Sequence, residues 1–134
     1  MIYSLNKNDL SVLNNTFIDR KEIENELLNN PFGKVLLYEE DKQIIGYIYY
    51  SDIYDRVEIN QFEIDLIHRN CGKGKELLKK LIETVDKDIT LEVRIDNYPA
   101  IKVYEDNGFK QTAIRKGYYK GIDGLLMERK KDSE

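Results

Sequence analysis

A glycine-containing turn with basic side chains is the segment of this sequence whose residue types most clearly suit a ligand. Gly72 and Gly74 lie between Arg69 and Lys75, and a segment with helical apolar spacing follows directly. No Ser, Thr, Asp or Pro is placed to cap that helix, so its first backbone N–H groups have no partner within it. The positive end of the helix dipole reinforces the basic side chains. We therefore expect the turn to bind a phosphate or pyrophosphate.

Two common nucleotide-binding loops do not match this turn. The loop of phosphate-binding NTPases needs Ser or Thr after its lysine, but Glu76 follows Lys75. A dinucleotide-binding fold needs a third glycine where this chain has Leu77. Glu92 does stand at the distance expected of a ribose-binding acid, but it lies inside a strand pattern rather than at a strand end. The chain is also short for a dehydrogenase.

The same turn holds the residue types of a thiol hydrolase, namely Asp65, His68 and Cys71. Catalytic triads are usually assembled from distant segments, so three members within seven residues are not expected to converge. The chain has one cysteine and one histidine in total, which excludes an internal disulfide and makes a Cys/His zinc site implausible. We expect no metal, and assign Cys71 to the loop through its backbone N–H.

Composition is that of one soluble domain. The 134 residues are 41% hydrophobic and 34% charged, with no membrane-spanning run and no signal-peptide pattern, so we expect a cytoplasmic protein. The net charge of −4 argues against a general nucleic-acid binder. Residues 1–66 hold 6 Lys/Arg and 13 Asp/Glu (−7), and residues 67–134 hold 15 and 12 (+3). Either a site for an anion beside a cation or ordinary surface clustering accounts for this asymmetry.

Apolar periodicity predicts an alternation of strands and helices. Expected are a strand over 2–5, helices over 8–16 and 20–29, strands over 35–38, 44–50 and 56–65, a helix over 74–85, a strand over 90–95, a helix capped by Asp96-Asn97, and a final hairpin over 109–119 and 124–129. Strand 56–65 has mixed polarity on both faces, with the odd residues from Val57 to Glu63 expected opposite the even ones, and this indicates contact with a ligand. The strand–helix–strand spacing of residues 56–95 predicts a parallel βαβ unit.

Two motifs give the sequence a family resemblance. Arg69-x-x-Gly72-x-Gly74 resembles the Q/R-x-x-G-x-G/A turn of the GNAT acetyltransferases, whose backbone amides hold the pyrophosphate of acetyl-CoA. Residues 91–109 resemble the LEVR-x-x-N-x-x-A-x-x-x-Y-x-x-x-G-F segment of the RimI-type ribosomal-protein alanine N-acetyltransferases within that family. The likeness extends over about residues 35–128 and is weak over the first thirty.

The resemblance implies an α/β (α+β) GNAT fold. It consists of a single mixed, mostly antiparallel sheet of about six to seven strands, a central βαβ unit and about four helices. Residues 1–134 would form one domain, with 130–134 as a charged, flexible tail.

The resemblance also assigns the chemistry, which is transfer of the acetyl group of acetyl-CoA to an amine in a ternary complex. Glu92 would be the general base and Tyr104 the general acid that protonates the CoA sulfur. Strand alternation places Glu92 on the face of Thr90 and Arg94. An ion pair between Glu92 and Arg94 is the structural alternative, and Glu63 or Glu58 could serve as base instead.

The family's contacts map onto further residues here. Expected cofactor contacts come from the strand before the turn, from the turn itself and from Asn97, which could equally serve as a helix cap: Phe62, Glu63, Ile64, Arg69, Asn70, Cys71, Gly72, Lys73, Gly74, Lys75 and Asn97. Tyr118 and Tyr119 are expected to contact the acceptor, although both could be ordinary strand residues. Leu66, Asn70 and Lys73 depart from the usual family pattern within the loop.

The favoured acceptor is a protein N-terminus such as the N-terminal alanine of a ribosomal protein. A peptide α-amine has a pKa near 7.7–8, about two and a half units below that of lysine, so a carboxylate can deprotonate it near neutral pH. Alternatives are a small amine, a lysine side chain, or a non-catalytic acetyl-CoA sensor. We expect a monomer or weak homodimer, with no nucleic-acid or membrane partner.

Overall fold

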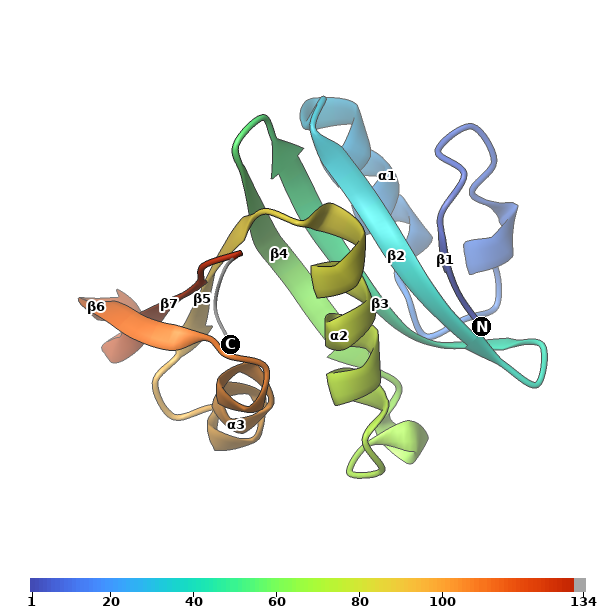
Figure 1. Cartoon of the computed structure of the whole chain (residues 1–134). Coiled ribbons are helices and arrows are strands. Elements are labelled where there is room, and N and C mark those ends of the chain that lie inside the picture. The colour runs from blue at the N-terminus through green and yellow to red at the C-terminus, as the bar shows by residue number, and fades with distance from the viewer. Residues whose placement is uncertain (132–134) are drawn as a thin grey trace.

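The chain folds into one seven-stranded mixed sheet covered by helices on both faces (Figure 1). A computed structural model describes residues 1–131. Within that range there are three α-helices and two single-turn 3-10 helices. The elements are β1 (Ile2–Ser4), η1 (Ser11–Leu13), α1 (Arg20–Asn29), β2 (Gly33–Glu40), β3 (Gln43–Ile53), β4 (Arg56–Ile64), η2 (Leu66–His68), α2 (Lys73–Val85), β5 (Asp88–Arg94), α3 (Tyr98–Asp106), β6 (Lys110–Tyr119) and β7 (Ile122–Arg129).

The strand order is β1-β2-β3-β4-β5-β7-β6, and every neighbouring pair is antiparallel except β4 and β5. Helix α2 connects these two strands, so the predicted parallel βαβ unit is confirmed. The single mixed, mostly antiparallel sheet is confirmed as well.

Two hydrophobic cores lie on opposite faces of the sheet. Helices α2 and α3 cover the face seen in Figure 1, where Leu77, Leu78 and Leu81 of α2 are fully buried. Helix α1 packs behind the sheet through the buried Ile23. This separation decides which side chains of β4 and β5 meet the α2–α3 layer and which face the α1 side.

A β-bulge in β4 changes the face on which its later residues lie. Tyr49 pairs with Gln61 whereas Tyr50 pairs with Ile59, so Asn60 is an extra residue in β4. The expectation of strict alternation along this strand was therefore wrong, because an extra residue reverses the alternation that follows it. Beyond the bulge, Phe62 and Ile64 join the α2-side core that holds Val57 and Ile59.

The parallel ladder between β4 and β5 is short. It runs from Arg56–Asp88 to Ile59–Leu91 and stops at the bulge. Beyond this point the two strands diverge (Figure 1), and β4 has no neighbour on its β5 side among the described residues. Apart from the Ile64 carbonyl, which accepts from the Arg69 side chain, the backbone groups of residues 60–64 on that edge are left available for another partner.

The helix predicted over residues 8–16 is not formed; the chain makes only the 3-10 turn η1 there. Short polar side chains compete for its backbone groups. The Asp9 carboxylate accepts from the Ser11 N–H, and the Thr16 hydroxyl donates to the Leu13 carbonyl. Asn15 has a φ of 59°, which ends any helical path. The other predicted helices and strands are present, with ends that differ by a few residues.

The end of the chain is partly anchored. The Lys131 N–H donates to the Asp88 carboxylate, and the Lys130 ammonium lies 3.4 Å from both Asp88 and Glu128. The rest of the predicted tail, residues 132–134, lies outside the described residues.

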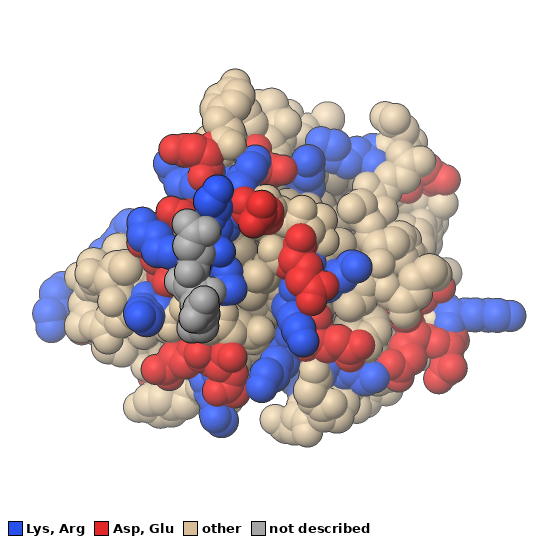
Figure 2. All heavy atoms as spheres, viewed as in Figure 1, with Lys and Arg blue, Asp and Glu red and all other residues tan. Residues whose placement is uncertain are grey.

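On the face of α2 and α3, Lys and Arg are interspersed with Asp and Glu rather than gathered by sign (Figure 2). No described helix is long and apolar enough to cross a membrane.

Candidate active site

The glycine turn leads into α2 with an uncapped helix start, as predicted. Asn70 and Gly72 adopt left-handed backbone conformations, with φ of 63° and 81°. Gly72 is the N-cap residue and supplies no side-chain hydrogen bond, and the first N–H bonded within the helix is that of Glu76. The N–H groups of Lys73, Gly74 and Lys75 therefore have no partner among the described residues. Three converging donors at the positive end of a 13-residue helix suit a pyrophosphate.

The side chains of Arg69 and Lys73 are directed away from that cluster of N–H groups. The Arg69 Nε donates to the Ile64 carbonyl at 2.8 Å, and its Nη2 lies 3.6 Å from Glu63. The Lys73 ammonium binds Glu40 at 2.5 Å, and this contact raises the pKa of Lys73. Arg69 thus fixes the turn to the end of β4, and Lys73 fixes α2 to the β2–β3 hairpin. If these two residues hold a cofactor in this arrangement, they do so through the backbone.

Phe62 connects the turn to Tyr104. A β-carbon added at Gly74 would lie 3.5 Å from the Phe62 ring, and the ring centroids of Phe62 and Tyr104 are 6.0 Å apart. Phe109 packs on the other side of Tyr104 at 5.6 Å. These contacts bring a residue of α3 within reach of the gap between β4 and β5. Asn97 caps α3 through the Ala100 N–H, which is the structural role considered for it.

Tyr104 is buried, with 6% of its surface exposed. Its hydroxyl makes no hydrogen bond within residues 1–131, but the hydroxyl oxygen itself is not fully buried, so a ligand can reach it. Burial, followed by the nearby Tyr119, raises the pKa of Tyr104. The phenol therefore stays protonated at neutral pH and can donate a hydrogen bond.

Glu92 lies on the opposite face of β5 from the buried Leu91 and Val93, as predicted. Its Oε2 is buried and has no hydrogen-bond partner in the described chain, while its Oε1 lies 3.5 Å from the Arg115 Nη2. Arg94 instead makes two hydrogen bonds to Asp96, so the expected alternative of a Glu92–Arg94 pair is not formed. The carboxylate is held by one exposed guanidinium, a contact that contributes at most about 1 kcal/mol.

Gly124 provides the space that Glu92 occupies. It pairs with Arg94 of β5 on one side and with Arg115 of β6 on the other. A β-carbon at this position would overlap the Glu92 Oε2 and would lie 3.2 Å from the Tyr119 ring. The absence of a side chain here lets the carboxylate lie close to the β7 backbone.

The end of the β6–β7 hairpin places Tyr119 near Glu92 and Tyr118 against Arg115. The two tyrosine rings make an edge-to-face contact at 4.9 Å, and the Arg115 guanidinium lies 4.4 Å from the Tyr118 ring centroid. Burial raises the pKa of Tyr119, and the Glu92 carboxylate adds to this effect. Tyr119 is thus electrostatically coupled to both Glu92 and Tyr104.

Asp123 organises this hairpin end. Its carboxylate accepts from the Gly117 N–H at 2.9 Å and lies 3.4 Å from the Lys116 ammonium, and these contacts lower the pKa of Asp123. Gly117 has a φ of 61°, within the register shift that separates the Arg115–Gly124 and Tyr119–Ile122 pairs. Tyr118 lies within this irregularity and its ring contacts the Arg115 guanidinium.

Five of the predicted site residues lie in two neighbouring groups. Phe62, Gly74 and Tyr104 border the gap on the α2–α3 side, and Glu92 and Tyr119 lie on the other face of β5. The sequence reasoning gave no role to Arg115 or Gly124. Pairing of the last two strands could have placed Arg115 and Gly124 beside Glu92, but the register of β6 and β7 cannot be predicted from the sequence because of the irregularity at residues 116–118.

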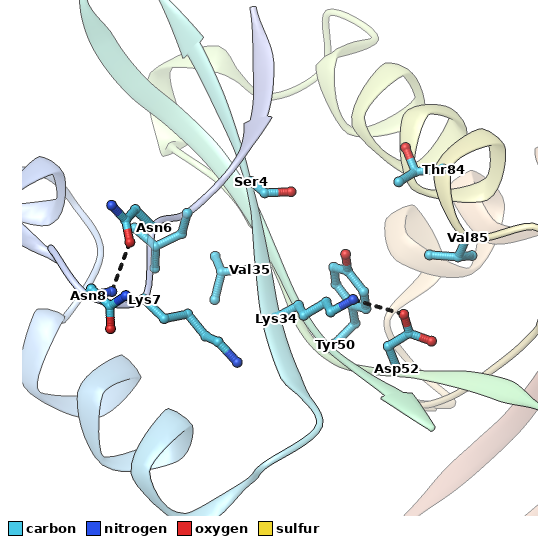
Figure 3. A pocket seen from close by; sticks show the side chains of 11 residues that line it. Ser4, Asn6, Lys7, Asn8, Lys34, Val35, Tyr50, Asp52, Thr84 and Val85 are labelled. Carbon is cyan, nitrogen blue, oxygen red and sulfur yellow. Dashed lines mark hydrogen bonds and ion pairs between the residues drawn. The ribbon is translucent and has the colours of Figure 1, made fainter. Parts of the chain in front are cut away.

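A separate pocket of about 480 Å³ lies at the other end of α2, near Thr84 and Val85 (Figure 3). Lys34 points toward Asp52 across it, with an ion-pair distance of 3.1 Å. None of the predicted site residues lines this pocket. It is therefore not the site described above.

Comparison with known proteins identifies the family. The family model described as "Acetyltransferase (GNAT) family" matches residues 2–109. The chain is 35% identical over 104 residues to the ribosomal protein bS18-alanine N-acetyltransferase of Haemophilus ducreyi, covering 73% of this chain and 72% of that protein. It is 34% identical over 108 residues to a Bacillus subtilis protein to which the same activity is provisionally assigned, with 76% and 72% covered. The chain belongs to the GNAT family of acetyltransferases.

Solved structures agree on the fold. The crystal structure of the Escherichia coli ribosomal-protein-S18-alanine N-acetyltransferase superposes with a TM-score of 0.83 at 22% identity, over 100% of this chain and 95% of that one. A GNAT acetyltransferase from Elizabethkingia anophelis, solved with acetyl-CoA bound, gives 0.77 at 20% identity over 97% of each chain. The protein is accordingly an N-acetyltransferase that uses acetyl-CoA as its acetyl donor.

Proposed function

We propose that this enzyme acetylates the α-amino group of a protein N-terminus, and that its acceptor is the N-terminal alanine of a ribosomal protein. The observation that carries the proposal is the similarity to the Haemophilus ducreyi and Bacillus subtilis proteins, whose names specify the bS18 alanine acceptor. The reaction would take place in the cytoplasm, where new ribosomal proteins and acetyl-CoA are both present.

The acetyl donor would span the gap between β4 and β5. Its pyrophosphate would bind the free N–H groups at the start of α2, and its pantetheine arm would pair with the open edge of β4 over residues 60–64. A backbone N–H of that edge would polarise the thioester carbonyl. The uncapped helix and the unpaired strand edge support this assignment because both leave backbone groups without partners.

Glu92 would act as the general base and Tyr104 as the general acid. The α-amine nitrogen bonds to the acetyl carbonyl carbon as the carbon–sulfur bond breaks. Glu92 accepts the proton that the nitrogen loses, and Tyr104 donates the proton that the thiol gains; solvent then restores both residues. General acid–base catalysis of this kind contributes about 10²- to 10⁴-fold, or about 3–5 kcal/mol.

The direct test is to supply acetyl-CoA together with one of three acceptors and to follow thiol release. The acceptors are a peptide beginning Ala-Arg, the same peptide with a blocked N-terminus and an internal lysine, and spermidine. We expect release with the first acceptor to exceed that with the other two by at least about tenfold in kcat/KM, because its amine has the lower pKa. Preference for spermidine or for the lysine would refute the proposed acceptor. Cofactor binding without release for any acceptor would favour the sensor alternative.

A further inference from the structure

Arg115 places a positive charge beside the carboxylate that is proposed to receive a positively charged amine. Its Nη2 lies 3.5 Å from the Glu92 Oε1, and about half of its side chain is exposed. If the acceptor were recognised only as a cation, this guanidinium would repel it and would compete with it for Glu92. The ion pair therefore suits a substrate that has both an amine, which Glu92 can bind, and an oxygen that can accept a hydrogen bond from Arg115.

The position of Arg115 is fixed from two sides. Its guanidinium lies 4.4 Å from the Tyr118 ring centroid, and the Tyr118 ring is itself held by Tyr119. On its other side lies the Glu92 carboxylate, which occupies the space that a side chain at position 124 would fill. A guanidinium has five N–H donors, and one weak contact to Glu92 leaves most of them available.

Several charged residues near Glu92 already have partners among the described residues. Arg94, on the far side of Gly124, is bound to Asp96 through two hydrogen bonds, and Lys116 and Asp123 are paired with each other. Glu63, on the neighbouring strand, contacts Arg69. The Glu92–Arg115 pair differs from these, because the Glu92 Oε2 has no hydrogen-bond partner in the described chain and about half of the Arg115 side chain is exposed.

A peptide N-terminus has the complementary pattern. Its amine nitrogen and its first carbonyl oxygen are separated by three bonds, so a group that binds one has the other close by. A polyamine or a lysine side chain presents an ammonium with no such carbonyl. We propose that Arg115 donates to the first peptide carbonyl of the acceptor while Glu92 receives its amine, and that this selects peptide N-termini over simple amines. The inference rests on the proposed function and names the residue that would give it specificity.

The test pairs a change in the protein with a change in the acceptor. The acceptors are an Ala-Arg peptide and its analogue in which an alkene replaces the first peptide bond, which removes the carbonyl oxygen without adding a charge. The enzymes are the wild type, Arg115→Met, Arg115→Lys and the control Lys116→Met, which removes the neighbouring exposed charge. Comparing ratios of kcat/KM between the acceptors cancels the difference in reactivity of their amines.

We expect the wild type to favour the peptide by at least about tenfold, as for a hydrogen bond to a charged group. Arg115→Met should reduce that ratio by at least about tenfold relative to the wild type, by slowing the peptide alone. Arg115→Lys should retain part of it, because an ammonium can still donate, and Lys116→Met should leave it unchanged.

Two results would overturn the inference while leaving the proposed function intact. One is a wild type that acetylates both acceptors equally, and the other is an Arg115→Met enzyme that slows both by the same factor. A wild type that acetylates neither acceptor, while still binding acetyl-CoA, would refute the proposed function and the role of Arg115 together.

Discussion

Glu92 and Gly124 are so close that a β-carbon at position 124 would overlap a carboxylate oxygen of Glu92. Gly124 is not required here for an unusual backbone conformation, since it does not appear among the residues with positive φ. The glycine is required because a side chain from the adjacent strand occupies its space. The proposed base is thus held by the shape of β7 as much as by its ion pair with Arg115.

Replacing Gly124 with alanine should displace the Glu92 carboxylate and lower kcat by at least about tenfold, because the proposed base would leave its position. The free energy of unfolding, measured by urea denaturation, should fall by no more than about 1 kcal/mol, because the overlapping atom is the movable end of the Glu92 side chain. The matched control is the same change in a Glu92→Ala background, where the overlap no longer exists. An equal stability loss in both backgrounds would show that the contact with Glu92 is not the reason for glycine.

Glu92→Gln should keep the fold and acetyl-CoA binding but lower kcat by about 10²- to 10⁴-fold, because the amide cannot accept the proton of the amine. Steady-state kinetics with the Ala-Arg peptide measure the loss, and a thermal shift on adding acetyl-CoA measures binding. Glu63→Gln is the matched control, since that residue was the alternative base. If Glu63→Gln gives the larger loss, the two assignments are exchanged.

Tyr104→Phe should bind acetyl-CoA normally and lose at least about tenfold in kcat. The ring keeps its contacts with Phe62 and Phe109, and only the hydroxyl is removed. Because the pKa of Tyr104 is raised, the wild-type phenol remains protonated as the pH rises past its ordinary value. The wild-type rate should therefore rise with amine deprotonation near pH 8 and show no decline from Tyr104 up to about pH 10. Unchanged turnover in Tyr104→Phe would remove this residue from the mechanism.

Gly72→Ala should weaken acetyl-CoA binding and leave kcat at saturation nearly unchanged. Gly72 has a φ of 81°, and a β-carbon there meets no other atom, so the cost is backbone strain of about 1 kcal/mol. Relief of that strain would reorient the N–H groups that start α2. Isothermal titration with CoA measures the affinity. Gly121→Ala, which changes another left-handed glycine at the β6–β7 turn, is the control and should leave the CoA affinity unaltered.

Asp52→Asn should reduce stability most at neutral pH. The Asp52 carboxylate bonds Lys87 and Lys34, and these contacts, led by Lys87, lower its pKa. Because the pKa of Asp52 is lower in the folded state, its carboxylate stabilises the fold at pH values above its unfolded-state pKa of about 3.9. This stabilisation is lost as the pH falls through the folded-state pKa. The wild type should exceed the variant by about 1–2 kcal/mol at pH 7 and by progressively less below pH 4, by urea denaturation. A difference that does not vary with pH would exclude ionic stabilisation.

Most of the fold could be predicted because its signals are local. The α2 segment has a strong apolar periodicity, and Asn97 with Pro99 marks the start of α3. The helix prediction for residues 8–16 was wrong. The apolar spacing there is helical, but the side chains of Asp9 and Thr16 form hydrogen bonds with backbone groups that a helix would need. The bulge at Asn60 was not predictable from alternation, since it depends on how β4 pairs with β3.

The residues of the candidate site could be proposed from the sequence only where a motif marked them. The turn from Arg69 to Lys75 could be read as an anion site from physical reasoning, and the resemblance to the family added Glu92 and Tyr104. The directions of the Arg69 and Lys73 side chains could not be foreseen, because their partners Ile64 and Glu40 lie on other strands. The relation of Arg115 to Glu92 likewise depends on tertiary register.

The short β4–β5 ladder divides the sheet into two units, because four residue pairs provide the backbone pairing between β1–β4 and β5–β7 in the described chain. A molecule lying in the gap would contact both units and would join them as an additional strand does. Native-state hydrogen exchange should then find that the free enzyme opens more readily at this seam. At a hundred times its dissociation constant, a ligand adds about 2.7 kcal/mol to the folded state. The survival of this enzyme against cellular proteases would consequently follow the supply of its own acetyl donor.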